Sequence, residues 1–268
     1  MTITKALKYK NIDWTEAQIL LSHVLNKEKL FLLTHGDYSL TESEEKGYID
    51  CVEKRLEGVP IAYITHKREF YGRDFYINEN VLIPRPETEL IIDVVKSLSL
   101  PNNSKVLDLC TGSGIIPITL MQEIKDLKVL ATDISDKALE VARINAQKYG
   151  LNITFIESDM FEAVPKEKYN VITANPPYIP THDSNTLDED VKREPSVALY
   201  GGEDGLYFYR IILCKGKEYL QEKGFMVLEI GYNQKDQIET LACENGYRVV
   251  FFKDLQGFDR VALLCLNI

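Results

Sequence analysis

From about residue 104 onwards, short apolar stretches alternate with longer segments that carry helical periodicity. The stretches predicted as strands are 105–110, 129–134, 153–158, 170–175, 225–230, 248–254 and 259–268, and the helical segments include 135–150, 204–224 and 233–246. Strands that alternate with helices form a doubly wound, mostly parallel sheet of the α/β class. The last stretch follows its neighbour after a short turn, so we expect it to be an antiparallel hairpin strand.

The first part of the chain has a different pattern, in which helical periodicity dominates. One of its segments opens with a capping box formed by Thr41 and Glu44. The next stretch is rich in aromatic and β-branched residues around a Gly-Arg-Asp turn, which predicts a β-hairpin. We therefore expect a helical domain over 1–61, a hairpin linker over 62–84 and an α/β domain over 85–268.

Charge and cysteine content narrow the function classes. The chain of 268 residues has a formal net charge of −10, and its first 80 residues hold 11 Lys and Arg against 13 Asp and Glu. This balance argues against broad binding to nucleic acid, which relies on cations that neutralise phosphates. Five scattered cysteines argue against a disulfide framework or a zinc site. Because no signal segment or long apolar run occurs, we expect a cytoplasmic protein without membrane contact.

Polar residues follow the first two strands of the α/β domain. The first strand leads into a turn at a helix N-terminus, where free N–H groups and glycines allow close approach to a ligand; its residues are Cys110, Thr111, Gly112, Ser113 and Gly114. Asp133 ends the second strand, and its carboxylate can accept hydrogen bonds from ribose hydroxyls. The alternative is a helix-capping role, although Ser135 can already serve as that cap. The pair predicts a nucleoside site.

The third strand ends in "IESDMF". Asp159 could accept a hydrogen bond from an adenine amino group, with Met160 or Phe161 covering the ring. An ordinary loop acid beside two core residues explains the pattern equally well. The cofactor could be NAD(P) or S-adenosylmethionine, but the dinucleotide fingerprint G-x-G-x-x-G is not present at the turn.

The fourth strand ends in "ANPPYIP", residues 174–180. Proline cannot donate to a β-ladder, so this stretch must leave the sheet as a rigid loop. A dehydrogenase does not need such a loop. Methylation of a planar amino nitrogen does, because resonance delocalises the nitrogen lone pair and the nitrogen must be held toward the methyl donor. The side-chain oxygen of Asn175 and the carbonyl of Pro176 can accept hydrogen bonds from the two N–H groups. Pro177 stiffens the loop, and Tyr178 can flank the substrate.

With these motifs the chain resembles, over nearly its whole length, the release-factor glutamine methyltransferases (PrmC/HemK family). "NPPY" alone is shared with amino-methyltransferases that act on adenine; more specific are "FYGRDFYINENVLIPRPETE", "DLCTGSG", "EPSVALYGGEDGLYFYR" and "DLQGFDRV". The resemblance implies a Rossmann-like, seven-stranded methyltransferase domain preceded by a small helical domain. It also implies transfer of a methyl group from S-adenosyl-L-methionine, which becomes S-adenosyl-L-homocysteine. The acceptor that the resemblance implies is the glutamine N5 atom in the Gly-Gly-Gln motif of peptide-chain release factors 1 and 2.

The resemblance also implies roles for residues. Asp108 and the turn from Cys110 to Gly114 would surround the methionine end of the cofactor, Asp133 would hold the ribose, and Asp159 and Met160 would border the adenine. The loop from Asn175 to Tyr178 would hold the glutamine, with Asn175 and Pro176 as the catalytic acceptors. Arg85, Pro86 and Glu87 would border the same pocket. The helices of 1–61 would dock the release factor, and no metal is expected.

One residue departs from the family pattern, and two other functions remain open. Many relatives have glycine where this chain has Cys110, whose thiol narrows the approach to the cofactor; we expect it to be buried and inert. An adenine-N6 methyltransferase would need a base-flipping pocket and a basic surface, which the net charge argues against. A nucleotide-binding regulatory module would leave "NPPY" unexplained. We also expect a monomer.

Overall fold

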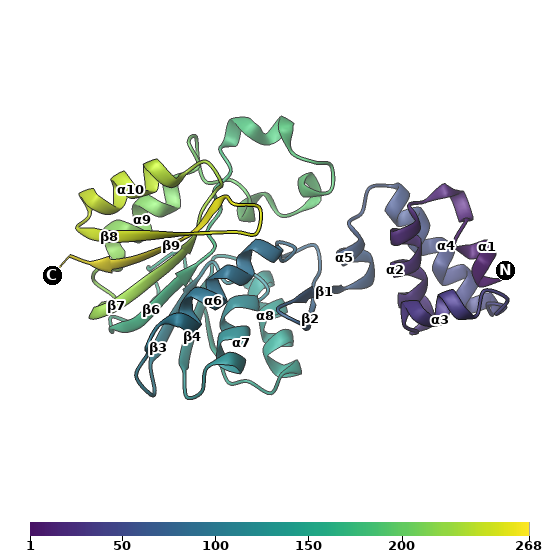
Figure 1. Ribbon diagram of the computed structural model, residues 1–268, viewed down its shortest axis with the longest axis horizontal. Helices are drawn as coiled ribbons and strands as arrows, with labels where there is room; N and C mark the ends of the chain where they lie inside the picture. The colour runs from purple at the N-terminus through teal and green to yellow at the C-terminus, as the bar shows by residue number, and fades with distance from the viewer. Residues whose placement is uncertain (268) are drawn as a thin grey trace. The chain divides into compact units, whose positions relative to one another are not determined.

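The computed structural model describes residues 1–267, which divide into two compact units (Figure 1). The smaller unit contains residues 1–67 together with 188–193, and the larger unit contains 68–187 and the chain from 194 onwards. No helix in the described part of the chain is both long and apolar enough to cross a membrane.

The larger unit is built on a seven-stranded sheet with the order β5-β4-β3-β6-β7-β9-β8. The strands are β3 (Lys105–Leu109), β4 (Lys128–Asp133), β5 (Thr154–Glu157), β6 (Tyr169–Ala174), β7 (Leu220–Glu229), β8 (Tyr247–Lys253) and β9 (Asp259–Leu266). The first five are parallel, and β9 runs antiparallel to both β7 and β8. This topology confirms the predicted α/β sheet and its antiparallel last strand.

Helices form a layer on each side of this sheet (Figure 1). The first layer contains α6 (Glu89–Ser97), α7 (Ile115–Glu123) and α8 (Asp136–Lys148), and the second contains α9 (Tyr207–Gly216) and α10 (Lys235–Glu244). Side chains of β3 alternate between the layers, so that Leu107 and Leu109 join α9 and α10 in one buried core. A strand buried on both faces has apolar residues at successive positions, as Val106 and Leu107 do in β3, although Asp108 interrupts the run.

The structure corrects one predicted boundary. The helix expected over 204–224 ends at Gly216, and β7 begins at Leu220, because Leu220 is buried and pairs with Tyr169 of β6. The predicted hairpin is confirmed, and both of its strands lie within 62–84. Residues 61–65 form a helix, α5 (Ile61–Thr65), before the strands β1 (Lys67–Phe70) and β2 (Arg73–Tyr76).

The smaller unit is helical. It consists of α1 (Ile3–Ala6), η1 (Tyr9–Asn11), α2 (Trp14–Leu25), α3 (Lys29–Thr34), α4 (Glu42–Leu56) and α5, and the segment 188–193 joins it through an ion pair between Asp190 and Arg55 of α4. The predicted capping box of Thr41 and Glu44 is present at the start of α4. Tyr48 is fully buried and donates its hydroxyl hydrogen to the carbonyl of Ala6, which ties α4 to α1.

Asn145 of α8 joins the hairpin to the start of α7 within the larger unit. Its side-chain nitrogen donates to the carbonyls of Ser113 (2.9 Å) and Tyr76 (3.0 Å), and its side-chain oxygen accepts from the N–H of Tyr76 (2.7 Å). The side chain has no solvent exposure. Asparagine is a weak helix former, so its place inside α8 is explained by these three bonds.

We predict that Asn145→Ala lowers the free energy of unfolding by about 2–4 kcal/mol, because it removes the hydrogen bond to the buried Ser113 carbonyl and both bonds to the part-buried backbone of Tyr76. The thermal unfolding midpoint of the purified protein measures this change. Gln147→Ala, at an exposed position on the same helix, is the matched control and should shift the midpoint by little. Equal midpoints for the two variants would contradict the linking role of Asn145.

Candidate functional site

The candidate site lies at the carboxyl ends of the parallel strands. β3 and β6 are neighbours whose register pairs Asp108 with Thr173 and Leu109 with Ala174, so Cys110 and Asn175 leave the sheet side by side. After β3 the chain forms β4 and β5, which lie on one side of β3 in the strand order, and then β6, which lies on the other side. Ligands of open α/β sheets bind at this reversal of strand order.

A cavity that opens to solvent occupies this position; the empty space in it, open solvent included, is about 980 Å³. The sequence-predicted site residues that line it are Cys110, Thr111, Gly112, Ser113, Asp133, Asp159, Met160, Asn175, Pro177 and Arg85. They follow β3, β4, β5 and β6 and come from the segment before α6. The cavity therefore brings together the glycine turn, the two predicted cofactor carboxylates and the asparagine of the proline loop.

Several predicted residues lie elsewhere. Asp108, Gly114, Tyr178, Pro86 and Glu87 do not line the cavity; Pro176 is not among the lining residues either, although it lies between the lining residues Asn175 and Pro177 in the chain. Phe161, considered as a cover for a bound ring, is buried in the core and stacks on Tyr219 at 4.7 Å between centroids. Gly114 has a structural role: its φ is +79°, and a Cβ there would lie 3.1 Å from side-chain carbons of Ala142 and Ile118.

Cys110 adopts a left-handed backbone conformation, with φ at +55°. L-residues pay a steric cost in this region and glycine does not, which explains why glycine suits this turn. The cysteine Sγ lies 3.8 Å from Sδ of Met160. Cys110 was expected to be buried, but it is half-buried and lines the cavity. Desolvation, followed by the nearby carboxylates of Asp133, Asp108 and Asp159, raises the pKa of the Cys110 thiol and so favours its protonated form.

Asp133 holds the glycine turn in place. One carboxylate oxygen accepts from the N–H of Gly112 (2.8 Å) and the other from the N–H of Ser135 (3.0 Å). Ser135 itself caps α8 by accepting from the N–H of Ala138. Burial raises the pKa of Asp133, although the backbone donors oppose this shift. Each carboxylate oxygen has two lone pairs, so Asp133 retains acceptor capacity toward the cavity.

Asp108 lies within β3 and has no solvent exposure. One of its oxygens accepts from the hydroxyl of Thr173 (2.6 Å), while the other is buried without a hydrogen-bond partner in the described structure. Desolvation raises the pKa of Asp108 to about 7. A buried, half-satisfied carboxylate costs stability unless a cation approaches it.

The charges around the cavity favour a cationic ligand group. Asp133 and Asp159 line it, and Arg85 is the one cationic side chain among the described lining residues. The guanidinium of Arg85 is already paired with the buried carboxylate of Glu194 at 2.5 Å, and Glu194 also accepts from the N–H of Ile83. The two carboxylates would repel the phosphates of a dinucleotide. They would attract a sulfonium or an ammonium group.

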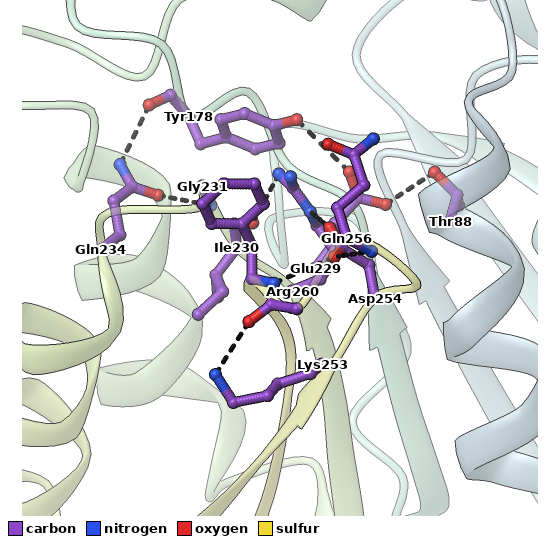
Figure 2. Close-up of polar contacts among 12 residues, drawn as sticks. Thr88, Tyr178, Glu229, Ile230, Gly231, Gln234, Lys253, Asp254, Gln256 and Arg260 are labelled. Atoms are coloured by element: carbon purple, nitrogen blue, oxygen red, sulfur yellow. Dashed lines mark hydrogen bonds and ion pairs between the residues drawn. The ribbon is translucent and has the colours of Figure 1, made fainter.

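The proline loop is fixed from two sides. The carbonyl of Tyr178 accepts from the side-chain nitrogen of Gln234 (3.0 Å), and the Tyr178 hydroxyl lies 3.4 Å from a carboxylate oxygen of Glu229 (Figure 2). Gly201 approaches the loop so closely that a Cβ would lie 2.5 Å from the carbonyl oxygen of Pro177. These contacts tie the loop to the start of α10, to β7 and to the segment at Gly201.

Some residues of the site were missed in the sequence. Thr88 lines the cavity and accepts from the side-chain nitrogen of Asn175 (3.2 Å), and its own hydroxyl donates to Glu229 (2.6 Å). The other missed lining residues include Asn80, Val81, Leu82, Pro84, Val197, Ala198 and Phe208. The one signal in the sequence was that most of them lie in the segments "FYGRDFYINENVLIPRPETE" and "EPSVALYGGEDGLYFYR".

The chain matches two family models. Residues 87–194 match the methyltransferase small domain and residues 2–65 match the PrmC N-terminal domain. In solved structures, the larger fold is similar to a methyltransferase from Pyrococcus furiosus, with a TM-score of 0.57 at 21% identity over 81% of this chain and 98% of that chain. A second similar fold is that of the 16S rRNA N2 G1207 methyltransferase RsmC of T. thermophilus, with a TM-score of 0.54 at 14% identity over 75% of this chain and 50% of that chain.

Curated relatives match nearly the whole chain. The release factor glutamine methyltransferase of Clostridium acetobutylicum is 40% identical over 92% of this chain and 90% of its own length. That of Neisseria gonorrhoeae is 39% identical over 98% of this chain and 97% of its own length. A bifunctional methyltransferase of Rickettsia felis is 41% identical over 92% of this chain, which spans about half (53%) of that longer protein.

We predict that Asp108→Asn stabilises the protein increasingly as pH rises. The folded-state pKa of Asp108 is raised to about 7 from 3.8, so the wild-type protein loses stability as pH rises through this window. Between pH 5 and pH 8 the advantage of the variant should grow by about 3 kcal/mol. Unfolding midpoints at both pH values measure it, with the exposed Asp188→Asn as control. A constant difference between wild type and variant would rule out this titration.

Proposed function

The chain belongs to the release factor glutamine methyltransferase family, and we propose that it methylates the glutamine side-chain nitrogen N5 in the Gly-Gly-Gln motif of peptide-chain release factors. The methyl donor that we propose is S-adenosyl-L-methionine. The observation that carries the proposal is that Asn175 and Pro177 line the same cavity as the glycine turn and Asp133. The proline loop and the glycine turn thereby share one cavity, as the proposal requires.

The residues around the cavity fit this cofactor. The turn from Cys110 to Ser113 would hold its methionine end, Asp133 its ribose, and Asp159 and Met160 its adenine. Asp108, although it does not touch the cavity, contributes negative charge from below the turn. When bound, the cofactor supplies a methyl group on a sulfonium, which is already an activated leaving group. No general base or metal is therefore required of the protein.

The protein's own contribution is to hold the acceptor amide. Resonance delocalises the amide lone pair, as the rotation barrier of about 18–20 kcal/mol indicates. In our proposal the side-chain oxygen of Asn175 and the carbonyl of Pro176 accept hydrogen bonds from the two amide N–H groups and aim the nitrogen at the methyl group. Pro177 forms part of the wall, and Tyr178 anchors the loop. Such alignment can contribute on the order of 7–11 kcal/mol.

Specificity for a protein substrate requires contacts beyond a tripeptide. The family model for the N-terminal domain matches residues 2–65, which form the helical unit. We assign docking of release factors 1 and 2 to the helices of 1–61, ahead of the linker over 62–84 and the catalytic domain over 85–268. The enzyme would act as a monomer in the cytoplasm, where release factors work.

The direct test is transfer of a labelled methyl group from S-adenosylmethionine to purified release factor. A Gly-Gly-Ala variant of the factor is the matched control, and adenine-containing DNA and RNA are offered in parallel. Label on the intact factor alone supports the proposal. Label on DNA or RNA would favour the adenine-N6 methyltransferase, and no label on any acceptor would reject both functions.

We predict that Asn175→Ala lowers turnover by roughly 10²–10³, because one preorganised hydrogen bond to the reacting group is lost. Binding of S-adenosylmethionine, measured by calorimetry, should stay within a few-fold of the wild-type value. Turnover near the wild-type rate would remove Asn175 from the role of amide acceptor.

We predict the opposite pattern for Asp133→Ala. The variant loses both the ribose acceptor and the bond that holds Gly112, so the dissociation constant for S-adenosylmethionine should rise by at least tenfold. At saturating cofactor, turnover should recover much of its wild-type value. An unchanged dissociation constant would exclude Asp133 from the cofactor site.

A further inference from the structure

Glu229 is a buried carboxylate that the proposed reaction does not use. It ends β7, its exposed fraction is 1%, and it lies between Thr88 and Tyr178 (Figure 2). One carboxylate oxygen accepts from the Thr88 hydroxyl at 2.6 Å, and the other lies 3.4 Å from the Tyr178 hydroxyl. Burying a carboxylate is costly, so its presence beside the proline loop requires an explanation.

The direction of the hydrogen bonds links Glu229 to Asn175. An ionised carboxylate can only accept, so the single hydrogen of the Thr88 hydroxyl points to Glu229. The hydroxyl oxygen then has only lone pairs to offer to Asn175. The Asn175 amide must therefore turn its nitrogen toward Thr88, at 3.2 Å, and its oxygen away from it. An asparagine without such a partner can take either orientation.

We propose that Glu229 is a positioning residue, which acts through the Thr88 hydroxyl to present the oxygen of the Asn175 amide, and not its nitrogen, to the substrate. This role deepens the proposed function and rests on it, because an amide N–H substrate needs an acceptor at this point. A flipped Asn175 amide would offer N–H groups to the N–H groups of the substrate glutamine. Binding in the reactive orientation would then be lost.

The same geometry makes the amide orientation depend on the ionisation of Glu229. A protonated Glu229 can donate to Thr88, whose hydroxyl is then free to donate to the oxygen of Asn175 and turn the amide around. Burial raises the pKa of Glu229 to about 7; the bond from Thr88, the Arg260 guanidinium and Tyr178 oppose this shift, and Glu87 adds to it. These groups come from the α6 entry, β9 and the proline loop. From α9, Tyr209 also faces Glu229 and donates its hydroxyl hydrogen to the backbone carbonyl of Glu229 at 2.8 Å.

The positive charge of Arg260 favours the ionised form of Glu229 and so lowers its pKa, although no hydrogen bond or ion pair joins the two side chains in the described structure. Its guanidinium binds the carboxylate of Asp254 at 3.3 Å and donates to the carbonyl of Ile230 at 3.4 Å (Figure 2). Asp254 in turn accepts from the N–H groups of Gln256 and Phe258. The "DLQGFDRV" segment thereby builds a rigid hairpin turn that carries one cation to the end of β7.

The first experiment compares Thr88→Val with Thr88→Ser. Valine keeps the shape of the side chain and removes both hydrogen bonds, whereas serine keeps the hydroxyl. We expect Thr88→Val to lower kcat for release-factor methylation roughly 10- to 100-fold, with the dissociation constant of S-adenosylmethionine within about twofold of wild type. Thr88→Ser should recover most of the loss. Wild-type kcat in Thr88→Val, or no recovery in Thr88→Ser, would overturn the proposal.

The second experiment measures kcat against pH for the wild type and for Glu229→Gln. The wild-type rate should rise roughly tenfold from pH 6 to pH 8, as Glu229 ionises. Glutamine cannot ionise, so the rate of Glu229→Gln should be nearly flat over this range. A flat wild-type profile would overturn the link between Glu229 and the rate. An unchanged acid limb in Glu229→Gln would also overturn it, because it would assign the titration to another group such as Asp108.

A third measurement does not need the substrate. In the ¹⁵N-labelled protein, the side-chain amide signals of Asn175 are assigned by their loss in Asn175→Ala. They should shift between pH 6 and pH 8 in the wild type and should not shift with pH in Thr88→Val. Absence of the shift in the wild type would overturn the proposal even if release factor were not the substrate. Its presence together with no methyl transfer would instead reject the proposed function alone.

Discussion

The parallel pairing of β3 with β6 is the constraint on which the site depends. Its register sets Leu109 opposite Ala174, so the glycine turn and the proline loop leave the sheet at the same edge. Neither could work if the register slipped by one residue, because every side chain of the strand would change face. The bond from Thr173 to Asp108 crosses the same pair of strands and places a carboxylate below the turn. The pairing of β3 with β6 therefore also brings the two parts of the site together.

The sequence predicted the parts of the site that depend on local patterns. Apolar runs located the strands, and the residues immediately after them, such as Gly112, Asp133 and Asn175, line the cavity. The missed residues depend on tertiary contacts. Thr88 reads as an ordinary helix-start residue and Glu229 as the polar end of a strand, and only folding brings them to Asn175. The early start of β7 was missed because a core position for Leu220 overrides the helical pattern around it.

Buried acids recur along this edge of the sheet. Burial raises the pKa of Asp108, Asp133 and Glu229, and Asp108 has one oxygen without a partner in the described structure. Burying a carboxylate costs stability unless its hydrogen-bond partners compensate for the lost solvation. Local rules of stability are broken where a protein performs its function, so these three positions mark the site as clearly as the cavity does.

The position of β9 between β7 and β8 has a consequence for the order in which the parts of the sheet can fold. Because β9 is antiparallel to β7, its first residues lie beside the last residues of β7, and Arg260 reaches the carbonyl that follows Glu229. Among the described strands, β9 is also the last to leave the ribosome. A nascent chain can pair the five parallel strands early, since domains begin to fold during synthesis. The guanidinium of Arg260 reaches the end of β7 only when β9 is inserted into the sheet. A chain stalled before β9 would therefore have the five parallel strands but not the complete site.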